Sequence, residues 1–168
     1  VERIRKAGNV ALAHEADESS TVPEELVAEC WSLGLIQAAI PEAHGGYGAK
    51  PSALSGALVA EALAEGDLAI AMHLLSPHLV VDPLIHLGSR EQQASVLPAY
   101  SGENFTAGSA AVLEPGHGLA GPKMKCSARR DGENWVLRGD KCCVPLAKSS
   151  PYIVIYAVDE EGLTAAFI

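Results

Sequence analysis

The feature that most constrains the fold of this chain is a change of hydrophobic period near residue 104. Before it, apolar residues recur at helical spacing, and Ala, Leu and Glu are abundant. After it, short runs rich in Val, Ile, Tyr and Thr are separated by glycine-containing turns, a pattern typical of strands. Two such different patterns indicate two layers or domains. We therefore predict an α+β protein with an all-α helical domain over residues 1–104 and a β domain over residues 105–168.

The excess of acidic charge is confined to the first of these parts. Residues 1–104 contain 5 basic and 14 acidic side chains, whereas residues 105–168 contain 7 of each. A formal net charge of −9 argues against nucleic acid as a partner, because phosphate contacts need clustered Lys and Arg. The 48% share of apolar residues excludes an intrinsically disordered chain.

Start and stop signals divide the first part into short helices. We expect the first over about residues 1–19, and a second with Thr21 as N-cap, Pro23 in its first turn and Gly34 as its stop. Further helices are predicted over about 51–65, from 68 (capped by Asp67) to Ser76-Pro77, from Asp82-Pro83 to Gly88, and from Ser89 to Leu97-Pro98.

Strand patterns occupy the second part. We predict strands over 105–113, 123–130, 134–137, 152–158 and 163–168. Asp131-Gly132 and the run from Asp159 to Gly162 mark hairpin turns, which indicate an antiparallel sheet.

No membrane span is predicted. The longest apolar stretch, residues 68–81, is interrupted by two histidines, a serine and a proline, and the first residues lack the apolar core of a signal peptide. The cysteines show no spacing typical of a zinc site or a disulfide framework: Cys30, Cys126, Cys142 and Cys143. We therefore expect reduced thiols and a cytoplasmic protein.

Metal ligation and nucleotide binding are both disfavoured by spacing. His73 and His78 lie five residues apart, whereas pairs on one helix face lie three or four apart, so we expect two partly buried histidines and no metal site. The run from Gly45 to Gly48 follows a helix, and Pro51 removes an amide from the next one. We interpret this run as a structural loop, because a phosphate cradle follows a strand and opens a helix.

Glu114 is the carboxylate that stands out from the solvated helix faces. It is expected at the end of a strand, directly before the glycine-rich run Pro115-Gly116-His117-Gly118. Loops of this kind on rigid strands often approach a ligand closely. This loop is therefore the first place at which we expect function.

Several segments, in this order, resemble the acyl-CoA dehydrogenase superfamily. They are Gly34-Leu35-Ile36, Ile40 to Gly48, Glu61 to Asp67, Gly88 to Gln93, Leu97-Pro98, Ser101-Gly102-Glu103, Glu114 to Gly118, and Trp135 to Lys141. Their order and spacing cover most of the chain, which makes the match specific.

The resemblance implies a helical domain, a central β-barrel and a C-terminal four-helix bundle. It also implies FAD, an acyl-CoA substrate, dehydrogenation at the α and β carbons, an electron-transfer flavoprotein or similar acceptor, and a homo- or hetero-oligomer. The family's catalytic Glu belongs to the bundle. We expect this chain to be a truncated piece with an incomplete barrel and no bundle, so no catalytic residue is named.

Two segments of the family approach the flavin, and the resemblance places seven residues there. They are Val112, Leu113, Gly118, Leu119, Cys143, Val144 and Pro145. The chain departs from the family pattern at four of them, since Leu113, Leu119, Cys143 and Pro145 stand where Thr, Ser, Trp and Thr are usual. Pro145 has neither a hydroxyl nor a backbone N–H. The alternative is therefore a non-catalytic structural subunit of the same fold in a hetero-oligomer.

Overall fold

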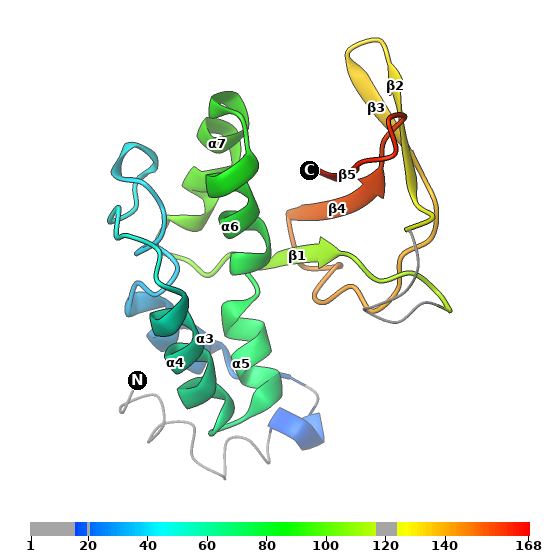
Figure 1. Cartoon of the computed structure of the whole chain (residues 1–168). Coiled ribbons are helices and arrows are strands. Elements are labelled where there is room, and N and C mark those ends of the chain that lie inside the picture. Colours follow the sequence, from blue (N-terminus) through cyan, green and yellow to red (C-terminus); the bar gives the residue numbers. More distant parts are fainter. Residues whose placement is uncertain (1–15, 20, 117–123) are drawn as a thin grey trace. The chain divides into compact units, whose positions relative to one another are not determined.

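The computed structural model describes residues 16–19, 21–116 and 124–168, which form two compact units, 1–107 and 108–168 (Figure 1). The first unit is helical and the second is built on a sheet, so the predicted α+β class is confirmed. Most of the predicted first helix lies outside the described residues, and residues 16–19 are helical.

Besides residues 16–19, the described part of the first unit contains five α-helices and two short 3₁₀ helices. They are α3 (Glu24–Ser32), η1 (Glu42–His44), α4 (Ala53–Ala64), α5 (Leu68–Leu75), α6 (His78–Leu87), α7 (Arg90–Val96) and η2 (Leu97–Tyr100). Two predicted caps are confirmed. Asp67 accepts a hydrogen bond from the amide of Ile70 at 2.8 Å, and Ser89 forms a capping box with Gln92.

Two predicted helix starts are wrong. Pro23 occupies the N-cap position of α3, and the Thr21 hydroxyl instead lies 2.7 Å from that of Ser19. Pro83 does not begin a helix but lies inside α6, which starts at His78 directly after Pro77. Proline there costs one backbone hydrogen bond. The apolar face that runs through α6 outweighs this loss, because Val80 and Val81 are fully buried.

The core of the helical unit joins α3, α4 and α5. Leu26, Cys30, Leu63, Ile70 and Leu74 belong to this buried cluster. Beside it, Phe105 packs between two aromatic side chains. It meets the ring of Trp31 edge-on at 5.4 Å between centroids and stacks on His73 at 5.0 Å. Burial lowers the pKa of His73, so the neutral imidazole is favoured at this contact.

The α5–α6 segment, Leu68–Leu87, is long and apolar enough to cross a membrane by length and composition alone. However, α5 ends at Leu75 and α6 begins at His78, so Ser76-Pro77 interrupts it as predicted. In addition, 44% of its most apolar window is buried inside the protein. We therefore interpret α5 and α6 as helices of a folded core.

The second unit contains β1 (Gly108–Ala111), β2 (Ser127–Asp131), β3 (Asn134–Arg138), β4 (Tyr152–Val158) and β5 (Thr164–Phe167). Their order is β1-β4-β2-β3, with β5 also paired to β4, and the described strands form an open sheet. The predicted hairpins are confirmed, since β2 pairs with β3 and β4 with β5 in antiparallel fashion.

The expectation of a wholly antiparallel sheet is wrong. β1 runs parallel to β4 over four residue pairs, from Gly108–Tyr152 to Ala111–Ile155, and β2 meets β4 in parallel at Ser127–Val158. Hairpin turns define the orientation of strands that are neighbours in sequence. β1 instead pairs with a strand some 40 residues later, and no local signal specifies that choice.

Candidate functional site

The candidate site begins where β1 ends. Ser109 is fully buried on β1, and its hydroxyl donates a hydrogen bond to the carbonyl of Pro145. The chain then leaves the sheet through Val112 and Leu113 to reach Glu114. The end of β1 is therefore tied to the segment around Pro145, which lies more than 30 residues later in the sequence.

Glu114 is buried, with 6% of its surface exposed. Its two carboxylate oxygens accept hydrogen bonds from the backbone amides of Lys125 and Cys126, each at 2.7 Å. The ammonium of Lys141 completes the arrangement at 3.0 Å and also donates to the carbonyl of Val112 at 3.2 Å. Because the Lys141 side chain is only 9% exposed, the pair is shielded from solvent.

These contacts lower the pKa of Glu114 from 4.5 to about 2. The backbone hydrogen bonds from Lys125 and Cys126 are the main cause; burial opposes them, and Lys141 adds to the lowering. A carboxylate with such a low pKa and occupied oxygens is a poor general base. Glu114 therefore joins two segments of the chain. The carboxylate at which we first expected function is a structural anchor.

A second link joins the same two segments through the backbone. The amide of Cys142 donates to the carbonyl of Leu113 at 2.9 Å. With the two Lys141 contacts, residues 112–114 are thereby tied to residues 141–142 at three points, and the Ser109 bond ties β1 to Pro145.

The segment after Cys142 has an unusual backbone. Cys143 and Leu146 have φ angles of 52° and 50°, in the left-handed region that favours glycine. The carbonyl of Leu146 accepts hydrogen bonds from the amides of Ser149 and Ser150, each at 3.0 Å. This segment is therefore a compact turn held by its own hydrogen bonds.

The structure brings five of the seven predicted flavin-proximal residues into two adjacent segments. Val112 and Leu113 follow β1, and Cys143, Val144 and Pro145 lie on the facing turn. Gly118 and Leu119 lie outside the described residues. Val112 and Cys143 are exposed, while Leu113, Val144 and Pro145 are half-buried.

Sequence reasoning missed the two side chains that assemble this site, Lys141 and Ser109. Lys141 lies within a segment quoted for the family resemblance, but its partner is 27 residues away. The sequence around Lys141 gave no signal for a buried pair, because its neighbours are Asp140 and Cys142. Ser109 gave no signal, because a lone hydroxyl in a strand is common.

The glycine-rich loop and the two histidines of the helical unit have structural surroundings. The Gly45–Gly48 loop uses its amides internally, since those of Gly46, Tyr47 and Gly48 donate to carbonyls of residues 41, 37 and 40, so it is a structural loop as predicted. His73 and His78 are both half-buried. Within the described ranges, no group of three or more His, Cys, Asp or Glu is arranged to hold a metal ion.

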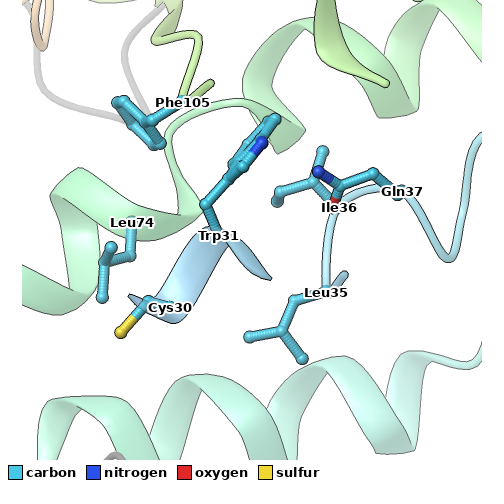
Figure 2. Close-up of a pocket in the computed structure, with 7 residues that line it drawn as sticks. All are labelled: Cys30, Trp31, Leu35, Ile36, Gln37, Leu74 and Phe105. Carbon is cyan, nitrogen blue, oxygen red and sulfur yellow. The ribbon is translucent and has the colours of Figure 1, made fainter. Parts of the chain in front are cut away.

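The helical unit contains a small apolar hollow that no motif predicted (Figure 2). Its lining comes from α3, the loop after it, α5 and the end of the unit: Cys30, Trp31, Leu35, Ile36, Gln37, Leu74 and Phe105. Gln37 is 6% exposed, and no described residue donates to its Oε1. The indole N–H of Trp31 is already donated to the carbonyl of Gly102 at 2.9 Å, so it does not supply that bond.

A helical unit followed by a mixed sheet defines an α+β protein. A solved enzyme structure has a similar fold. A glutaryl-CoA dehydrogenase of Mycobacterium smegmatis, solved in complex with FADH2, is similar at a TM-score of 0.78 and 26% identity, over 98% of this chain and 42% of that chain. The profile of the family described as "Acyl-CoA dehydrogenase, N-terminal domain" matches residues 3–103. The chain therefore belongs to the acyl-CoA dehydrogenase family.

Curated relatives agree with this assignment. A probable medium-chain specific mitochondrial acyl-CoA dehydrogenase of Caenorhabditis briggsae is 34% identical over 80% of this chain and 32% of its own length. A probable acyl-CoA dehydrogenase of Mycobacterium tuberculosis is 33% identical over 88% of this chain and 37% of its own length. The chain thus spans about a third of the length of these relatives.

Proposed function

We propose that this chain forms the helical domain and part of the flavin-binding β domain of an acyl-CoA dehydrogenase, with the boundary near residue 104. The observation that carries the proposal is the junction of residues 112–114 with residues 141–145. Three contacts make this junction: the Glu114–Lys141 ion pair, the hydrogen bond from Lys141 to the Val112 carbonyl and the Cys142–Leu113 backbone bond. The nearby Ser109–Pro145 bond ties β1 to the same turn. These contacts bring together the two segments that the family resemblance assigns to the flavin.

The chemistry of these residues fits a flavin through the main chain and apolar side chains. A flavin ring is a flat, largely apolar surface rimmed by groups that accept or donate hydrogen bonds. The exposed side chains of Val112 and Cys143 would supply apolar surface, and the backbone amides of Val112 and Leu113 would supply donors, since the carbonyls of these two residues are already bonded to Lys141 and Cys142. Pro145 donates nothing because it lacks an N–H, and its carbonyl already accepts from Ser109.

When bound, FAD would accept a hydride from the β-carbon of an acyl-CoA thioester. The part of this chain's own residues is positioning. Glu114 and Lys141 hold the two segments at one separation, and their charges satisfy each other out of solvent. We name no catalytic base, since Glu114 is anchored. An acyl-CoA substrate, an electron-transfer flavoprotein or similar acceptor, an oligomeric assembly and a cytoplasmic location belong to the same proposal.

A second candidate function rests on Pro145 and Cys143. If the main-chain contacts alone do not hold a flavin, the chain would act as a non-catalytic subunit whose sister subunit completes the site. Each donor lost without replacement costs about 0.5–1.5 kcal/mol of binding. The two functions differ in one observable, namely whether flavin is taken up without a partner.

Substrate-dependent reduction of bound flavin tests the proposal. The purified full-length protein that contains this chain is loaded with FAD and mixed anaerobically with octanoyl-CoA, and the flavin absorbance band is followed. We expect bleaching of that band with octanoyl-CoA but not with free coenzyme A, which lacks the acyl carbons. A flavin-loaded protein that no acyl-CoA bleaches would contradict dehydrogenation. Flavin uptake only after co-expression with a sister subunit would favour the structural role.

A further inference from the structure

Cys142 and Cys143 are consecutive residues of the loop that follows β3, and their environments differ. Cys143 is exposed, whereas Cys142 is half-buried and its amide is bonded to Leu113. In an extended strand, successive side chains point to opposite faces. The left-handed φ of 52° at Cys143 breaks that alternation.

The two thiols belong to neighbouring residues of the chain. Burial is the main cause that raises the pKa of Cys142, and the neighbouring Cys143 adds to the rise. The chain therefore presents an exposed thiol at Cys143 next to a half-buried thiol at Cys142 whose protonated form is favoured. The other two cysteines, Cys30 and Cys126, are buried in the cores of their respective units and supply an internal comparison.

We propose that Cys142 and Cys143 form a redox-reactive vicinal dithiol, a modification site that low-molecular-weight disulfides oxidise to an intramolecular disulfide. The proposal does not rest on the proposed function, and it applies to the protein without bound flavin, because Cys143 also belongs to the proposed flavin site. The Cys143 thiolate attacks one sulfur of the external disulfide, so that the external S–S bond breaks and one thiol leaves. Cys142 then loses its proton and attacks the Cys143 sulfur, releasing the second thiol. The pair gives up two protons and two electrons, and the external disulfide takes them up.

The geometry makes this oxidation reversible. Adjacent Cα atoms across a trans peptide lie about 3.8 Å apart, which is shorter than the 4.4–6.8 Å usual for disulfides. The ring between neighbouring residues is consequently strained and easily reduced. Such labile, exposed disulfides serve regulation rather than structural cross-linking.

Oxidised glutathione and intact-mass measurement test the proposal. The full chain and its Cys142→Ser and Cys143→Ser variants are incubated with oxidised glutathione under native conditions, then mapped by peptide mass spectrometry. Cys30→Ser and Cys126→Ser are the matched controls, and circular dichroism checks that each variant is folded. We expect the native chain and both controls to lose two hydrogens at peptide 142–143 without retaining glutathione, and added thiol to reverse the loss.

The single variants separate the two steps. Cys142→Ser should stop at a stable glutathione adduct on Cys143, and Cys143→Ser should show neither adduct nor hydrogen loss at this peptide. Phenylarsine oxide, which bridges two close thiols, should add once to the native chain and to neither of these variants. A stable glutathione adduct on the native chain, or loss of two hydrogens in Cys143→Ser, would overturn the proposal.

Discussion

Replacing Glu114 by Ala is expected to lower the melting temperature of the β unit by an amount on the order of ten degrees. The substitution removes the acceptor for two backbone amides and leaves the Lys141 ammonium buried without its partner. A buried charge without a counter-charge is among the largest single destabilising effects in proteins. Glu114→Gln should lower the melting temperature less, because one side-chain oxygen still accepts a hydrogen bond.

The same carboxylate predicts a pH dependence of defined sign. Since the folded state lowers the pKa of Glu114 from 4.5 to about 2, its stabilisation is complete above pH 4.5 and is lost as the pH falls towards 2. Urea unfolding of the native chain and Glu114→Gln across this range measures the effect. We expect the advantage of the native chain to shrink steadily below pH 4.5. An advantage that stays constant down to pH 2 would contradict the ionised, anchored carboxylate, and the exposed Glu133→Gln is the matched control.

Gly46→Ala is expected to destabilise the helical unit by about 3 kcal/mol or more. A Cβ at residue 46 would lie 2.1 Å from the carbonyl oxygen of Ile40 and 2.5 Å from its Cβ. Ile40 is fully buried, and its carbonyl accepts the amide of Gly48 at 2.9 Å, so it has no room to move aside. The loss arises from backbone contact, which a change of side-chain rotamer does not relieve.

Gly56→Ala provides a matched control for this substitution. Gly56 lies inside α4, and a Cβ added there would have no atom within 4 Å. Alanine in a helix interior is favoured over glycine, so Gly56→Ala should raise the unfolding free energy by about 0.5–1 kcal/mol. Opposite signs for the two variants in urea unfolding are the expected result. Equal effects would show that the Ile40 contact does not limit residue 46.

Features that depend on contacts between residues close in sequence were predicted correctly, whereas features that depend on contacts between distant residues were not. Asp67 and Ser89 were identified as caps because a cap is a contact within three residues. Pro83 was misplaced because its position depends on the burial of Val80 and Val81, which local helix signals do not report. The parallel pairing of β1 with β4 was missed because the two strands are far apart in sequence, and local strand signals do not report which strands pair.

The candidate site shows the same division. The resemblance placed Val112, Leu113 and the turn from Cys143 to Pro145 near one another, and the structure joins the two segments. The resemblance did not identify Lys141 as the partner of Glu114. An ion pair between two residues that are 27 positions apart leaves no pattern in the composition or in the hydrophobic period. Glu114 was identified correctly as an unusual carboxylate, but its contacts make it an anchor.

Titration of the purified protein with FAD, followed by flavin fluorescence, tests the central proposal most directly. Native protein should quench the fluorescence saturably. Glu114→Gln, measured at a temperature at which it remains folded, should bind FAD at least about tenfold more weakly because the anchor between the two segments is weakened, while Glu133→Gln should match the native protein. Absence of saturable quenching, or equal affinity in the native protein and Glu114→Gln, would contradict a flavin site built on residues 112–114 and 141–145.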